Sequence, residues 1–66
     1  MLYEVALIEE PTHKQAEEGR IEKLVLAPTA IIANDDKAAG VQAVMANKDK
    51  LPEDLSRVKV LVRPFA

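Results

Sequence analysis

The single histidine, His13, is the first residue to test for chemistry, because it lies in the polar stretch EEPTHKQAEEGR beside several carboxylates. A histidine acts as a general base when folding brings its ring within hydrogen-bond reach of a nucleophile. The chain has no cysteine, so the nucleophile would have to be the hydroxyl of Thr12, Thr29 or Ser56. No spacing in the sequence fixes such a contact. We therefore expect His13 to be a solvent-exposed loop residue, and we predict a protein that is not an enzyme and has no catalytic residues.

Adjacent acidic residues are the second candidate for chemistry. They occur as four pairs, Glu9–Glu10, Glu17–Glu18, Asp35–Asp36 and Glu53–Asp54. Acid–base catalysis needs two carboxyl groups in unequal environments within a cleft, and adjacency alone does not provide them. The segment NDD also lacks the D-x-[DN]-x-[DN]-G-x5-E spacing of a calcium loop. Helix capping and solvated surface explain these pairs, and we predict no metal site.

Phosphate-containing ligands have little support in the sequence. Gly19 and Gly40 are isolated, so neither the P-loop nor the dinucleotide-binding motif is present. The 11 acidic and 9 basic residues give a net charge of -2, which disfavours a nucleic-acid surface. A basic row does occur near the C-terminal end, but Tyr3 and Phe65 are the only aromatic residues, too few for a base-stacking platform. We predict no cofactor and no nucleic-acid partner.

The length of 66 residues limits the chain to one domain, 1–66, with a marginal core. Without cysteine it has no disulfide, which fits the cytoplasm or another reducing compartment. The N-terminal segment MLYEVALIEE has no basic region, and Glu4 interrupts its apolar run. It therefore has the character of neither a signal peptide nor a membrane span, and we expect a soluble protein.

The hydrophobic pattern predicts four elements that would position these residues. Alternation over 2–9 predicts a strand, and the polar connection at about 10–20 could hold a short helical turn and could be mobile. Pro28 interrupts the apolar segment after it, which predicts one bent strand or two short ones. A helix is predicted near 36–47 and a last strand at 57–63.

Two details of the helix follow from its residues. Asn34 or Asp35 can cap its first turn. An apolar stripe predicts the face that lies on the sheet, and it consists of Ala38, Val41, Val44 and Met45. Gly40 weakens the helix interior by about 1 kcal/mol relative to alanine. Together with its small neighbours, Gly40 could let the helix approach the sheet closely.

These elements give an α+β fold with the order β-β-α-β. A hairpin followed by a helical crossover favours a three-stranded sheet in strand order 2-1-3, with the first strand antiparallel to both neighbours. One helix packs on one face, and no element remains to cover the other. Exposed apolar patches larger than a few hundred Å² usually mark interaction sites, so the uncovered face is the predicted interface.

The last strand supplies the predicted interface residues. Alternation places Val58, Val60 and Val62 on one face and the basic residues on the other, where Lys and Arg also discourage unwanted pairing at a sheet edge. On that second face we predict a partner interface of Leu61, Arg63 and Phe65. Phe65 has two alternative roles, since it either folds onto the core or anchors a partner.

Three segments, LYEVALIEEPT, LVLAPTAIIANDDKAAGVQAVM and VKVLVRPF, carry a resemblance that spans most of the chain. They resemble short open reading frames among the virion genes of tailed bacteriophages, in which a strand, an A-x-D helix start and a final V-R-P-F recur. The resemblance implies a capsid-associated, cement-like or decoration-like virion structural protein that binds a larger shell protein. It implies no catalytic residues, no membrane and a location in the virion.

Other functions stay open. The main alternative is a small cytoplasmic regulator that binds one host or metabolic protein through the apolar sheet face. A small enzyme that forms its site only at a subunit boundary, with His13 or paired carboxylates, is the third alternative. Homo-oligomer formation is open in each case.

Overall fold

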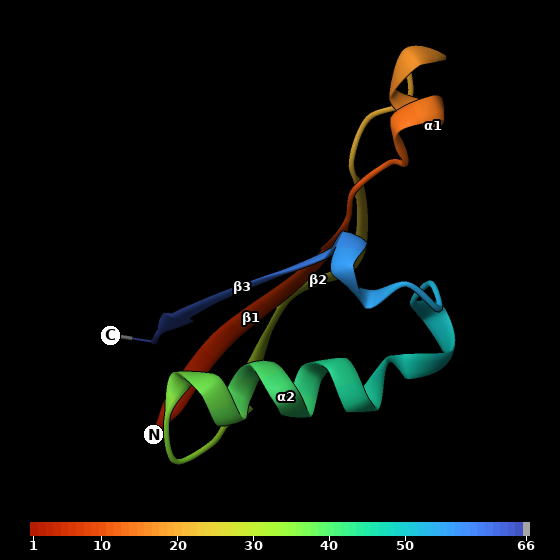
Figure 1. Ribbon diagram of the computed structural model, residues 1–66. Helices are drawn as coiled ribbons and strands as arrows, with labels where there is room; N and C mark the ends of the chain where they lie inside the picture. Colours follow the sequence, from red (N-terminus) through yellow and green to blue (C-terminus); the bar gives the residue numbers. More distant parts are fainter. Residues whose placement is uncertain (66) are drawn as a thin grey trace.

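The computed structural model describes residues 1–65, which form a three-stranded sheet with one main helix. The elements in chain order are β1 (Leu2–Glu9), α1 (His13–Glu17), β2 (Lys23–Ile32), α2 (Asp36–Ala46), the 3-10 turns Lys48–Lys50 and Leu55–Arg57, and β3 (Val58–Pro64). Helix α2 crosses one face of the sheet, whereas α1 lies at the far end of the β1–β2 hairpin (Figure 1). Among these residues, no helix has the length and apolar character needed to cross a membrane.

The sheet has the strand order β2-β1-β3, and β1 is antiparallel to both neighbours. This confirms the predicted topology and the α+β class. The bounds of β1 coincide with the prediction of 2–9, and β3 is shifted by one residue from the predicted 57–63. Alternation fixes these two strands well because both are regular: their pairing runs from Tyr3 opposite Pro64 to Glu9 opposite Val58 without a register shift.

Strand β2 is one continuous but irregular strand. Its register with β1 shifts between Val5 and Leu7, and again between Leu7 and Ile8. The first shift spans Ala27 and Pro28, and a proline cannot donate to the ladder. Of the two predicted alternatives, one bent strand or two short ones, the structure has one strand, and it lies at an edge of the sheet.

The core lies between β1 and α2. Tyr3, Val5 and Leu7 point from β1 toward the helix, where Ala39 and Ala43 are buried against them. Among residues 1–65, the large buried side chains are Tyr3, Val5 and Leu7, so the core is small. It forms because small residues on α2 allow the helix axis to approach the sheet closely.

The predicted contact face of α2 was partly wrong. Ala38 and Val44 are partly buried against the core, but Val41 is 57% exposed and Met45 64% exposed. The helix is rotated so that a row of small residues, Ala39, Gly40 and Ala43, faces the sheet. These small side chains let α2 lie close to the sheet, with Ala39 and Ala43 packed in the same cluster as Val5 and Leu7.

Gly40 lies where α2 approaches β3 closely. A Cβ atom at this position would lie 3.2 Å from Cγ1 of Val60 and 3.6 Å from Cγ2 of Val62. The first of these distances is tighter than ordinary van der Waals contact. The glycine therefore has a packing role that offsets its low helix propensity.

Side-chain caps start both helices. Of the two predicted capping residues of α2, Asp35 is the N-cap, and its Oδ1 accepts a hydrogen bond from the backbone N–H of Ala38 at 2.7 Å. In the polar connection, Thr12 and Gln15 form a capping box, in which each side chain accepts a hydrogen bond from the other's backbone N–H. The connection thus contains the short helical turn that its sequence allowed, and its mobility stays a prediction.

Candidate docking surfaces

The structure does not bring His13 together with a nucleophile. His13 lies exposed on α1, where its Nε2 is 3.0 Å from Oε1 of Glu17. Each of the three hydroxyl side chains instead bonds to a group within three residues of its own position. Within residues 1–65, Thr12, Thr29 and Ser56 therefore have local structural partners rather than the histidine.

The acidic pairs take part in capping and ion pairing. Asp35 caps α2, and Asp54 caps the 3-10 turn that precedes β3 by accepting hydrogen bonds from the backbone N–H and the hydroxyl of Ser56. The Ser56 hydrogen bonds hold the pKa of Asp54 below its usual value of 3.8, and the positive charge of Arg57 adds to this effect. No group of three or more His, Asp or Glu side chains in the described part of the chain could hold a metal ion.

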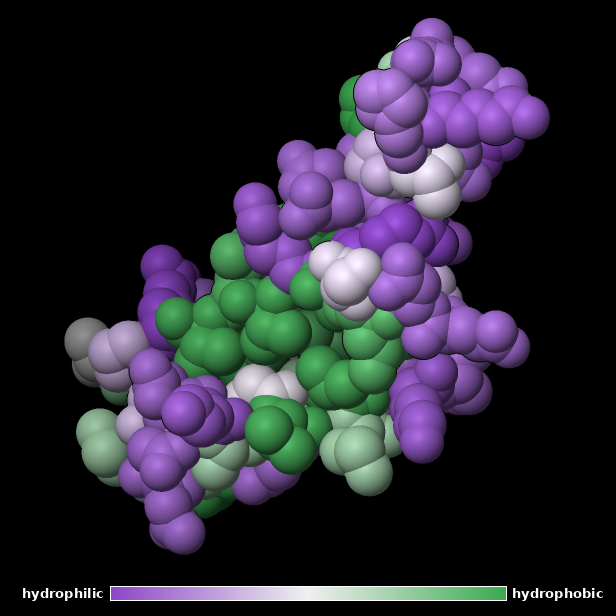
Figure 2. All heavy atoms as spheres, in the orientation of Figure 1, coloured by the Kyte–Doolittle hydropathy of each residue, from purple (hydrophilic) through white to green (hydrophobic). Residues whose placement is uncertain are grey.

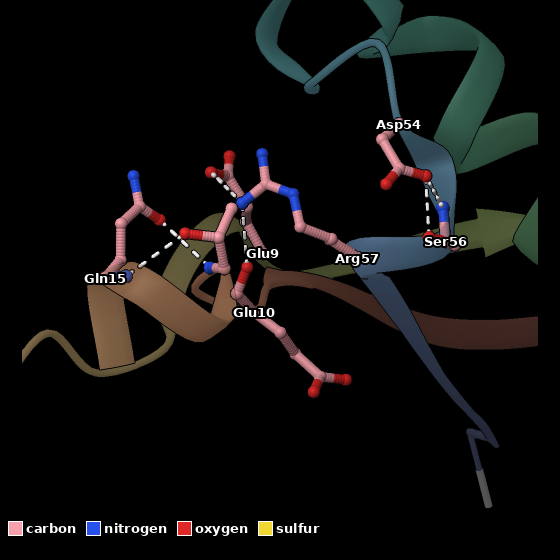
Figure 3. A network of polar contacts seen from close by, with 7 residues as sticks. Glu9, Glu10, Gln15, Asp54, Ser56 and Arg57 are labelled. Carbon is pink, nitrogen blue, oxygen red and sulfur yellow. Dashed lines mark hydrogen bonds and ion pairs between the residues drawn. The ribbon is translucent and has the colours of Figure 1, made fainter. Parts of the chain in front are cut away.

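Arg57 fixes the beginning of β3 against the end of β1. Its Nη1 donates to the carbonyl oxygen of Glu10 at 3.0 Å and lies 3.6 Å from Oε2 of Glu9, and the backbone N–H of Glu10 donates to the carbonyl oxygen of Arg57 at 2.7 Å (Figure 3). The nearby Asp54–Ser56 cap holds the turn that leads into the strand (Figure 3). These contacts hold the start of β3 against β1, in addition to the pairing along the strand.

One apolar row crosses the sheet on the side opposite α2. Directly opposed residues of antiparallel strands point to the same face. Leu2 is opposite Ile32, and the N–H of Phe65 donates to the carbonyl oxygen of Leu2 at 2.9 Å, so the three side chains lie side by side. Ile32 is 77% exposed and Phe65 is 53% exposed. We call this side of the sheet the open face.

The next residues along the open face alternate between polar and apolar. Nε and Nη2 of Arg63 each lie 2.6 Å from Oε1 of Glu4, which forms an ion pair across β1 and β3. Beyond it, Leu61 lies opposite Ala6, and with Pro28 they line a shallow hollow of about 220 Å³.

The three sequence-predicted interface residues, Leu61, Arg63 and Phe65, thus lie on the open face. Phe65 is not among the buried core residues. Sequence reasoning missed Leu2 and Ile32. Leu2 could have been found, because it shares its alternation with Glu4 and Ala6. The side of Ile32 could not, since the register shifts of β2 break the alternation before it.

A second apolar surface lies on the helix side of the sheet. An open groove of about 580 Å³ runs between α2 and β3, and its apolar lining consists of Gly40, Val41, Val44, Met45, Val60 and Val62. Figure 2 shows this apolar surface between the helix and the strand, bordered by polar residues. Asp36 and Lys37, in the first turn of the helix, complete the lining. We call this surface the α2–β3 groove.

The chain exposes more surface than its size requires. Its accessible area is 4866 Å², whereas a compact monomer of 7.3 kDa is expected to expose about 4,200 Å². The elongated outline of the chain, with extents of 41 × 22 × 14 Å, contributes to this excess of about 700 Å².

Comparisons with protein-family models, with curated proteins and with solved structures gave no match to this chain.

Proposed function

We propose that this chain is a non-catalytic docking protein that binds a larger protein assembly through its open face. The observation that carries the proposal is the exposed apolar row of Ile32, Leu2 and Phe65, with Leu61 further along the same face. No element within residues 1–65 covers this side of the sheet. An antiparallel sheet with one side in water usually carries polar residues on that side, so large aliphatic and aromatic side chains there indicate a partner.

The layout of the open face suits a specific contact. Apolar area contributes about 25 cal/mol per Å² when it is covered, so the row that ends at Phe65 supplies affinity. The Glu4–Arg63 pair lies between this row and Leu61. Because a buried ion pair must keep its hydrogen bonds, it favours a partner with matching polar groups at that point and so selects one orientation.

The assembly that we propose is the virion of a tailed bacteriophage, where the chain would be a capsid-associated cement or decoration protein bound to a larger shell protein. Support comes from the resemblance of LYEVALIEEPT, LVLAPTAIIANDDKAAGVQAVM and VKVLVRPF to small virion gene products. The open face suits this role, because a small chain that binds a shell needs one broad contact surface and no catalytic cleft.

Velocity sedimentation of a lysate from the native source tests the proposal, with the protein detected by an antibody. Co-sedimentation with particles is expected, and it should be lost on Ile32→Asp substitution. Ile21→Asp is the matched control, because Ile21 is 85% exposed but lies outside the strands of the sheet. Migration with one soluble protein would instead favour the cytoplasmic regulator, and migration as a free monomer in the presence of particles would overturn docking altogether.

A further inference from the structure

Strand β3 has a free edge with unused backbone hydrogen-bonding groups. The N–H of Glu10 donates to the carbonyl of Arg57 and the N–H of Phe65 donates to the carbonyl of Leu2, and the register between these two bonds has no shift. Residues of an antiparallel edge strand direct their backbone groups alternately toward and away from the neighbouring strand. The N–H and C=O groups of Val58, Val60 and Val62 therefore point away from β1. No strand in the described chain pairs with them.

Two of these valines face the α2–β3 groove. Val60 and Val62 form one side of the groove, and Val41 and Met45 of α2 form the other. An extended segment laid along β3 would thus pair its backbone with the free edge and direct every second side chain toward the groove. The groove volume of about 580 Å³ is within the roughly 300–1,000 Å³ of typical ligand sites.

The opposite edge of the sheet is not equivalent. Strand β2 contains Pro28, which lacks a donor, and its register with β1 shifts twice. Proline and irregular pairing both discourage addition of a strand. Strand β3 has neither between Val58 and Arg63. The structure is therefore open to strand addition at β3.

A second copy of this chain fits the β3 edge poorly. Antiparallel pairing of two β3 strands can be centred on Lys59, Val60, Leu61 or Val62. The first three registers place Lys59 opposite Lys59, Arg57 opposite Arg63, and Lys59 opposite Arg63, respectively, on the side away from the groove. The fourth places Pro64, which has no N–H to donate, opposite Val60. Like charges directly opposite each other destabilise a strand pair. Strand β3 carries no acidic residue that could offset them.

The same charges suit an acidic partner. Lys59 is exposed and has no ion pair within residues 1–65, and the side chain of Arg63 is 76% exposed although it contacts Glu4. We propose that the β3 edge and the α2–β3 groove bind an extended segment of a partner protein as a fourth strand. Aliphatic residues at alternate positions of that segment enter the groove, and acidic residues between them lie opposite Lys59 and Arg63.

This site goes beyond the proposed docking through the open face, since it uses the free edge of β3 and the groove on the helix side. Lys59 and Arg63, which contact its acidic residues, lie where the edge meets the open face. Basic residues at the edge exclude a like strand and accept an acidic one, so charge supplies specificity and the groove supplies affinity.

The test uses a fluorescent, acetylated peptide in which valine and glutamate alternate over nine residues, with binding followed by anisotropy. Saturable binding is expected, and a peptide with lysine in place of glutamate should bind about tenfold or more weakly. The peptide is expected to add antiparallel to β3, so that its valines lie directly opposite Val58, Val60 and Val62. Methylation of the valine amides should abolish binding, because those amides would donate to the carbonyls of β3. Equal binding of the methylated peptide, or no binding of the glutamate peptide to the folded protein, would overturn the proposal.

Two variants locate the site. Val41→Asp should weaken binding of the glutamate peptide about tenfold or more, because it places a charge in the groove at an already exposed position. Ile21→Asp is its matched control and should bind normally. Lys59→Glu should reverse the preference between the two peptides, which loss of folding cannot do. Absence of this reversal, or self-association that Val41→Asp removes, would contradict an acidic strand as the occupant.

The open face provides an independent check. Phe65→Ala should leave peptide affinity unchanged, because Phe65 does not line the groove. If peptide binding is found without particle binding, only the proposed docking through the open face is overturned. If particle binding is found without peptide binding, only the proposed strand addition at β3 is overturned.

Discussion

Truncation of Phe65 to alanine should weaken docking strongly, because we expect Phe65 to be an anchor of the interface. A side chain at the border of the interface would have a much smaller effect. A phenylalanine has a surface of about 200 Å², and 53% of Phe65 is exposed. Covering that area of about 100 Å² contributes about 2.5 kcal/mol. Alanine keeps the Cβ atom, so the expected loss of binding free energy is about 2 kcal/mol, or roughly a 30-fold rise in Kd.

The same substitution should affect folding less than the loss of a core aromatic residue. Removing a fully buried phenylalanine costs about 3–5 kcal/mol, enough to unfold so small a domain. Phe65 is about half exposed and lies outside the buried core. We therefore expect a loss of at most about 2 kcal/mol in the free energy of unfolding.

Two measurements on the Phe65→Ala variant separate these effects. Thermal unfolding gives the change in stability, and titration against the partner assembly gives the change in Kd. Ile32→Ala is a useful companion, because Ile32 is 77% exposed and its truncation should hardly change stability while still weakening docking. An unfolded variant whose surviving folded fraction binds with unchanged affinity would refute the interface role of Phe65.

Three further predictions concern the scaffold. Gly40→Val should lower the unfolding free energy by about 1–3 kcal/mol, because even a Cβ atom would lie 3.2 Å from Val60; unchanged thermal unfolding would show that β3 can move away from α2. Folding lowers the pKa of Asp54 from its usual value of 3.8, so its contribution to stability is present above that pH and is lost as the pH falls through the folded-state pKa. Urea unfolding in acid should therefore show a weaker pH dependence for Asp54→Asn than for the native chain, and identical curves would count against the cap. Backbone amides in the connection at 10–20 should exchange rapidly with solvent in the free chain, and full protection in an isolated monomer would contradict the predicted mobility.

Regular alternation made the strands and their order predictable. In β1, Tyr3, Val5 and Leu7 mark one face so clearly that both the bounds and the buried side follow from the sequence. In β3 the same reasoning places Leu61 and Phe65 on one face of the strand and Val58, Val60 and Val62 on the other. Two antiparallel neighbours then follow from the short hairpin and the helical crossover.

The groove could not be predicted, because it depends on how α2 is rotated. A stripe of larger apolar residues normally faces the core, yet here Ala39 and Ala43 do so and Met45 is left exposed. Which set of residues faces the sheet depends on the space that Val5 and Leu7 leave for the helix. The folded structure shows that space, and the sequence does not. The side of the sheet on which Ile32 lies could not be predicted for a related reason, since each register shift in β2 reverses the alternation that follows it.

The small core gives the proposed docking a consequence for the amount of protein in the cell. With Tyr3, Val5 and Leu7 as the large buried side chains among residues 1–65, the free chain has little stability in reserve. A partner at a hundred times its Kd would add about 2.7 kcal/mol by mass action. Copies made in excess of the partner would stay near their unfolding threshold, where proteases remove them. The partner's own abundance would then set the number of surviving copies, without a dedicated regulator of synthesis.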